Sequence, residues 1–192
     1  MIPTRVQKEN LLRQKAHVIW LFGLSGSGKT TLANHLAAGL HARGILAAQL
    51  DGDDLRAGLS QGLGFSDVDR TENLRRAAEV ARIMVNSGNV VICSFITPFR
   101  TQRDLVRRVI GDSDLSVVHV AATLEVCMQR DPKGLYSQAK AGRLPGLTGY
   151  EARFEEPTKS EVSLTVNTVG RTAEDCASEL MRALLPVIRP AG

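Results

Sequence analysis

A glycine-rich stretch, Gly23-Leu24-Ser25-Gly26-Ser27-Gly28-Lys29-Thr30, has the spacing G-x-x-x-x-G-K-[ST] and lies between a short apolar run and a helical pattern. Its glycines leave backbone N–H groups free to surround phosphate oxygens, and a helix that begins here adds unpaired N–H donors. In this motif the lysine contacts the β- and γ-phosphates, and the threonine hydroxyl is a ligand of Mg²⁺. We therefore predict that residues 23–30 and Thr31 bind a nucleoside triphosphate and that Thr30 is a metal ligand.

Short apolar runs alternate with helical patterns along the chain. The apolar runs lie at residues 17–22, 45–50, 90–95 and 117–121, with a weaker one at 162–166. The helical patterns lie at residues 29–41, 66–87, 100–110 and 172–188. Runs of this length suit strands that are buried on both faces. The alternation predicts an α/β fold, a three-layer P-loop NTPase domain over residues 1–192 with a five-stranded parallel sheet flanked by helices.

Composition places the chain among globular domains. It has 192 residues, 43% of them hydrophobic and 23% charged, which excludes a disordered chain. No run of about 18 apolar residues occurs, and residues 1–16, a polar N-terminal extension, lack the core of a signal peptide. The three cysteines form no CxxC pair, which argues against a disulfide framework or a zinc site. We therefore expect a cytoplasmic protein that does not bind a membrane.

Residues 130–159 break the alternation, because they are rich in Gly, Pro, Lys and Arg. A long loop inside a compact domain is usually functional. We predict a mobile basic lid here, with one short helix.

Two acidic residues, Asp51 and Asp53, follow the second apolar run. Ligands of doubly wound sheets bind beyond the carboxyl ends of the strands, so both residues belong to the expected active edge. Phosphoryl transfer needs a held Mg²⁺ and an oriented acceptor hydroxyl, and an aspartate at this edge could serve either purpose. A polar turn with an N-cap carboxylate explains the spacing equally well. Because no guanine-reading Asn/Thr-Lys-x-Asp segment appears, a small-molecule kinase is favoured over a GTPase-type or other nucleotide-binding switch.

Three further blocks carry a resemblance to a known family. They are LDGDDLRAGLSQGLGFSDVDRTENLRR at 50–76, FITPFRTQRD at 95–104 and RDPKGLY at 130–136. With the glycine-rich stretch before them, they resemble adenylylsulfate kinase (APS kinase). The resemblance implies transfer of the γ-phosphate of ATP to the 3′-hydroxyl of adenosine 5′-phosphosulfate (APS). The products would be 3′-phosphoadenosine 5′-phosphosulfate (PAPS) and ADP, with Mg²⁺ as cofactor, in sulfate assimilation.

The resemblance also implies roles for single residues. Asp53 would be the base or orienting group near the 3′-hydroxyl and, with Thr30, a ligand of the metal; Asp51 would support it, and Lys29 would stabilise the transferring phosphoryl group. Arg130 would pack against the adenine of ATP. The implied acceptor-binding residues are Arg56, Phe65, Arg70, Asn73, Ile96, Thr97, Arg100, Lys133, Leu135 and Leu147. Arginine suits phosphate and sulfate because its fork donates two parallel hydrogen bonds.

Two residues depart from the family pattern. Thr97 stands where the family usually has a serine that has been assigned a phosphorylated intermediate, and we favour direct in-line transfer instead. Leu147 stands where the family usually has a phenylalanine stacked on the acceptor adenine, and leucine loses about 0.5–1.5 kcal/mol of stacking. A weaker purine clamp keeps a second acceptor open, a nucleotide conjugate such as cytidine diphosphoramidate in polysaccharide modification.

The formal net charge is +4. Because the arginines gather in the blocks quoted above rather than in a stripe between aromatic residues, we expect small-molecule nucleotide substrates and no nucleic acid. The family resemblance implies a homodimer.

Overall fold

Five parallel strands form the central sheet, in the order β2-β3-β1-β4-β5. The strands are β1 (His17–Phe22), β2 (Ala47–Asp51), β3 (Val90–Phe95), β4 (Leu115–Ala121) and β5 (Leu164–Asn167). All residues of the central strand β1 are buried, as its continuous apolar run predicts. The computed structural model describes residues 2–189. The predicted five-stranded parallel sheet is confirmed.

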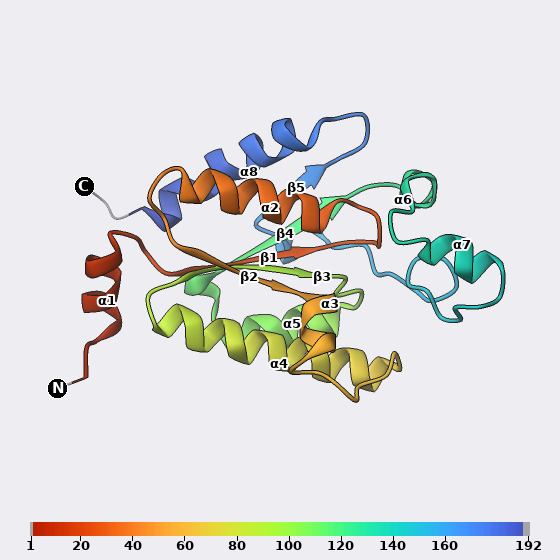
Figure 1. The fold of residues 1–192 in the computed structure, drawn as a ribbon, viewed down its shortest axis with the longest axis horizontal. Coiled ribbons are helices and arrows are strands. Elements are labelled where there is room, and N and C mark those ends of the chain that lie inside the picture. The colour runs from red at the N-terminus through yellow and green to blue at the C-terminus, as the bar shows by residue number, and fades with distance from the viewer. Residues whose placement is uncertain (1, 190–192) are drawn as a thin grey trace.

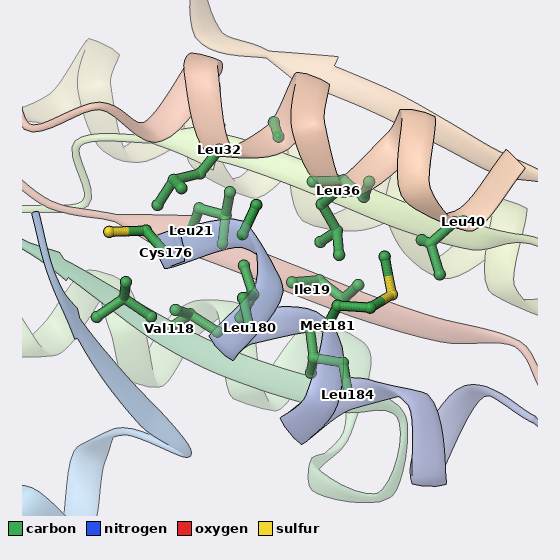
Figure 2. Packing of buried hydrophobic residues seen from close by; sticks show 14 of the residues in the cluster. Ile19, Leu21, Leu32, Leu36, Leu40, Val118, Cys176, Leu180, Met181 and Leu184 are labelled. Atoms are coloured by element: carbon green, nitrogen blue, oxygen red, sulfur yellow. The ribbon is translucent and has the colours of Figure 1, made fainter. Parts of the chain in front are cut away.

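Helices cover both faces of the sheet (Figure 1). On one face lie α2 (Lys29–His41) and α8 (Ala173–Ile188), and on the other lie α4 (Asp67–Asn86) and α5 (Arg100–Ile110). Leu32, Leu36 and Leu40 recur every four residues along α2, so they share one face and pack toward α8 (Figure 2). The result is the expected three-layer arrangement with an apolar core on each side of the sheet.

Four shorter α-helices complete the described residues 2–189. They are α1 (Arg5–Leu12), α3 (Gly52–Ala57), α6 (Leu124–Arg130) and α7 (Leu135–Lys140). One short helix was predicted between residues 130 and 159, and α7 is that helix. The other three were not predicted, because each is too short for apolar periodicity to stand out in the sequence.

The N-terminal extension is tied to the sheet by buried polar contacts. Gln14 is 1% exposed, and its amide donates to the carbonyls of Leu46 and Gly88 and accepts from the Leu46 N–H. Arg5 donates to the Asp114 carboxylate at 2.6 Å. The polar residues of this segment therefore dock it against the starts of three strands, β2, β3 and β4.

The predicted lid region, residues 130–159, has a small core of its own. Tyr136, Ala139 and Leu147 pack with Leu24 and Cys127 in a third apolar cluster beyond the edge of the sheet. The Tyr136 hydroxyl donates to the Ser25 carbonyl at 3.0 Å, which joins α7 to the glycine-rich loop. None of the helices in residues 2–189 has the length and apolar character needed to cross a membrane.

Candidate active site

One large cleft of about 970 Å³ opens at the carboxyl edge of the sheet. Its walls are the glycine-rich loop, the residues that follow β2 and β3, the region 130–147 and the loop between β5 and α8. A cleft at this edge is the usual ligand site of an open α/β sheet. Its volume lies at the upper end of the range for small-molecule sites.

The glycine-rich loop encloses the side chain of Lys29. The Lys29 ammonium is buried and donates to the carbonyls of Gly23 at 3.0 Å and Leu24 at 2.7 Å. Burial lowers the pKa of this ammonium to about 8. Gly28, the N-cap of α2, has φ +103°, a backbone conformation that strongly favours glycine. The loop therefore presents a lysine and a helix N-terminus to the same space, as phosphate binding requires.

The predicted nucleotide residues divide into two groups. Residues 25–31 line the cleft, as predicted. Gly23 and Leu24 do not line it: Gly23 donates its N–H to the Ile96 carbonyl at 3.2 Å, and the Leu24 side chain packs in the third apolar cluster. Any side chain at Gly23 would overlap the Val120 carbonyl, so this glycine serves close backbone packing.

Asp51, rather than Asp53, contacts the predicted metal ligand Thr30. The Thr30 hydroxyl donates to Asp51 Oδ2 at 2.9 Å, and Asp51 Oδ1 accepts the Asp53 N–H at 3.0 Å. Asp51 is therefore the N-cap of α3 and also a contact of the glycine-rich loop. The two interpretations of the acidic turn, a helix cap and a functional carboxylate, are compatible. A hydroxyl and a carboxylate oxygen are ligands of the kind Mg²⁺ takes beside substrate phosphates. Asp53, 70% exposed at its side chain, forms an ion pair with Lys133 from the lid region.

The acceptor wall is built around Phe65 and two arginines. The Phe65 ring is 66% exposed, lines the cleft, and lies 4.5 Å from the Arg56 guanidinium. Arg70 donates to the Phe65 carbonyl at 2.8 Å and to the Gly146 carbonyl at 2.9 Å, so it links α4 to the lid region. An exposed aromatic ring held by a guanidinium at a cleft suits stacking against a planar ligand.

Three cleft-lining residues carry a buried side-chain atom that is unpaired within residues 2–189. The atoms are Ser27 Oγ, Asn73 Oδ1 and Ser94 Oγ. Buried polar atoms without partners are costly, so all three are suited to meet a ligand or water. Ser27 and Asn73 were predicted as site residues, whereas Ser94 was missed. Its position offered a signal, because Ser94 is a polar residue near the end of the third apolar run, and in the sheet it pairs with Asp51 of β2.

The turn after β3 places Ile96 and Thr97 on the cleft wall, as predicted. The Thr97 hydroxyl, however, accepts the Trp20 indole N–H at 2.9 Å and is buried. Arg100 does not line the cleft. Its side chain is 66% exposed and lies 3.9 Å from Asp104 and 3.8 Å from Glu161. The prediction of an acceptor contact from Arg100 is therefore not supported, because the residue starts α5 with its side chain among acidic residues outside the cleft.

The remaining predicted residues line the lid side of the cleft. Lys133, Leu135 and Leu147 all do so, although Leu147 is only 6% exposed and packs mainly in the third apolar cluster. Arg130 donates to Thr168 Oγ1 at 3.0 Å and to the Thr168 carbonyl at 2.7 Å. The loop after β5 was missed as a wall of the site, because nothing in its sequence resembles a motif.

A cradle for phosphates that opens onto a second wall rich in arginine can hold a donor and an acceptor together. This arrangement, on a three-layer parallel sheet, defines a P-loop kinase. Residues 15–165 match the family described as adenylylsulphate kinase. The chain belongs to that family.

Several relatives are similar over nearly the whole chain. The adenylyl-sulfate kinase of Erwinia tasmaniensis is 43% identical over 97% of this chain and 89% of its own length. The bifunctional enzyme NodQ of Azospirillum brasilense is 44% identical over 93% of this chain, which spans only 28% of NodQ. Among solved structures, the Mycobacterium tuberculosis APS kinase CysC in complex with AMPPNP and APS has a TM-score of 0.85. It is 38% identical over 89% of this chain and 98% of its own.

Proposed function

We propose that this chain transfers the γ-phosphoryl group of ATP to the 3′-hydroxyl of APS, giving PAPS and ADP. The observation that carries the proposal is the joining of the phosphate cradle and the arginine-rich wall in one cleft. The relatives with the names given above support the choice of acceptor. The reaction would serve sulfate assimilation in the cytoplasm.

The donor half of the site is assigned to the glycine-rich loop. The N–H groups of residues 25–31 surround the phosphates, and Lys29 offsets the charge that develops on the transferring group. Thr30 and Asp51 would hold Mg²⁺ on the triphosphate, which supplies charge neutralisation when bound. Arg130 would cover the adenine beside Thr168.

The acceptor half is assigned to the opposite wall. Arg56 and Arg70 would bind the phosphosulfate end, and Phe65 would stack on the adenine of APS. The 3′-oxygen attacks the γ-phosphorus in line, and the bond from that phosphorus to the β–γ bridging oxygen breaks. Asp53 accepts the proton of the 3′-hydroxyl. Lys133 forms an ion pair with Asp53 in this structure. It would close with the lid region over both nucleotides, which limits the attack of water on the γ-phosphoryl group of ATP.

Direct transfer is favoured over a phosphorylated Thr97. The hydroxyl of Thr97 is buried and engaged by Trp20, so it is poorly placed to attack ATP. Thr97→Val keeps the shape of the side chain and removes the hydroxyl. We expect this variant to keep its kcat at saturating APS, and we expect the parent protein to carry no phosphate on Thr97, as measured with γ-labelled ATP and mass spectrometry.

The test of the acceptor is a parallel assay of APS and cytidine diphosphoramidate with ATP and Mg²⁺. We expect PAPS from APS and no phosphorylated cytidine product. Phosphorylation of the cytidine compound but not of APS would overturn the assignment, and ATP consumption without any phosphorylated acceptor would revive a nucleotide-binding switch. A homodimer, implied by the family resemblance, is tested by light scattering in the same buffer.

A further inference from the structure

The turn at residues 96–98 has a strained backbone at the acceptor wall. Thr97 has φ +45°, a left-handed conformation that is unfavourable for a β-branched residue. Such a conformation persists only where the surroundings hold it. One holding contact comes from Trp20, whose indole N–H donates to the Thr97 hydroxyl at 2.9 Å while its ring stacks on Phe95.

Arg103 supplies the second set of holding contacts. Its guanidinium is 2% exposed and donates to the Pro98 carbonyl at 3.2 Å and, more weakly, to the Thr97 carbonyl at 3.4 Å. The same group donates to the Glu155 carbonyl at 3.1 Å and to Glu161 Oε1 at 3.1 Å. A planar fork with several donors can bridge carbonyls of two segments at once, whereas an apolar side chain at this buried position could bridge none.

The second segment held by Arg103 is the end of the lid region. The Glu155 N–H donates to the Pro98 carbonyl at 2.9 Å, and the Glu155 carboxylate accepts the Arg100 N–H at 2.7 Å, at the start of α5. Residues 155–161 therefore meet the 96–98 turn directly, through the backbone hydrogen bond from Glu155 to Pro98, and through Arg103. The buried Arg103 guanidinium donates to both segments.

We propose that Arg103 is a positioning residue for the acceptor: it holds the 96–98 turn, and with it the returning end of the lid region, in the geometry that receives the acceptor nucleotide. The proposal rests on the proposed function in one respect, that the acceptor lies against Ile96 and Thr97. Arg103 does not itself line the cleft, so it acts through the turn. Trp20, the only tryptophan of the chain, is bonded to the same turn and reports on it.

The first experiment compares Arg103→Lys with Arg108→Lys, an exposed position on the same helix. Lysine keeps the positive charge opposite Glu161, but a single ammonium cannot reproduce the fork. We expect Arg103→Lys to raise KM for APS about tenfold and to leave KM for ATP within about twofold, as for a lost acceptor-side interaction. The Arg108→Lys control should match the parent protein in both constants.

The second experiment uses Trp20 emission, which requires no turnover. With ADP present, addition of APS should change the emission of the parent protein, whereas ADP alone should not. In Arg103→Lys the response to APS should be largely lost. Thr97→Val, which lacks the oxygen that accepts the indole N–H, should lose it too.

Equal increases in both KM values, or a full emission response in a folded Arg103→Lys protein, would overturn the proposal. Should Arg103→Lys fail to fold, Glu161→Gln tests the same clamp, because it weakens the hold on the guanidinium while preserving shape. Wild-type kinetics and emission response in Glu161→Gln would then count against the proposal, and the selective rise in KM for APS would support it.

Failure of the proposed function is a different result: the parent protein itself would then make no PAPS. In that case the emission response is measured with the acceptor that is phosphorylated.

Discussion

The pKa of the Lys29 ammonium is set mainly by its burial. Enclosed by its own loop, its ammonium has a pKa lowered to about 8, because burial disfavours the charged form. A bound triphosphate favours the charged form and therefore raises this pKa. Binding of ATP must then be accompanied by proton uptake above pH 8, and affinity must fall as the pH rises through this range.

Calorimetry at pH 9 in buffers of different ionisation enthalpy measures that uptake. We expect somewhat less than about one proton per ATP in the parent protein, and none in Lys29→Met. An uptake that persists in Lys29→Met would assign the proton to another group.

We expect substitution of Asp53 to affect kcat and substitution of Asp51 to affect Mg²⁺-dependent binding of ATP. Asp53→Ala should lower kcat by about 10²–10⁴-fold, the usual contribution of a positioned base, and leave the Kd for ATP nearly unchanged. Asp51→Asn should instead raise the Mg²⁺ concentration needed for tight ATP binding, because Asp51 is the carboxylate that contacts Thr30. Nucleotide titrations over a Mg²⁺ series, beside steady-state kinetics, separate the two. Unchanged turnover in Asp53→Ala would remove Asp53 from the mechanism.

At the scale of the elements, the strands carry two buried histidines. His17 on β1 lies 2.8 Å from Ser116 Oγ, and His119 on β4 packs in a cluster of three aromatic rings with Phe22 and Phe154. Burial lowers the pKa of each imidazole to about 4. Since an unfolded histidine titrates near pH 6.5, stability from the neutral rings is complete above that pH and is lost as the pH falls toward 4.

Urea unfolding at pH 7 and pH 4.5 tests the effect of His119. We expect His119→Phe, which keeps an aromatic ring in the stack, to lose about 1–2 kcal/mol less stability over this interval than the parent protein. Equal losses in both proteins would mean that His119 stays uncharged in the unfolded chain or is already charged when folded.

The helices and strands also show how much of the fold could be predicted from the sequence alone. Long apolar runs and multi-turn helices such as β1 and α2 were predictable, because burial on a sheet or along one helix face repeats over many residues. Short polar helices such as α3 were not, since one or two turns depend on a single cap such as Asp51. Within the site, most of the motif residues line the cleft. That Arg103 is buried behind the 96–98 turn while Arg100 is exposed was not predictable, because three residues along a helix decide which arginine is buried.

At the scale of the whole molecule, the candidate active site and the docked N-terminal segment lie at opposite ends of the sheet. The docked helix α1 lies at one end, and α6 and α7 lie at the other, beside the cleft (Figure 1). Six basic residues line the cleft, so the excess of positive charge in the sequence, a formal net charge of +4, is well represented there. They are Lys29, Arg56, Arg70, Arg130, Lys133 and Arg171.

Gln14→Leu tests this separation. It leaves the Leu46 N–H and C=O groups and the Gly88 carbonyl without their amide partner, so we expect a loss of about 2–4 kcal/mol in the free energy of unfolding. At a temperature well below the transition, kcat and both KM values should stay unchanged. A change in KM for either nucleotide would show that the two ends are coupled.

The position of Phe65 has a consequence for how acceptors change over evolution. Phe65 is largely exposed, and Leu59 and Val68, before and after it in the sequence, are exposed as well. Residues that bury so little surface contribute little to stability, so they can be exchanged without disturbing the sheet. The phosphate cradle, in contrast, is built against the buried core. A scaffold of this kind can keep one phosphate donor while natural selection exchanges the acceptor, one exposed side chain at a time.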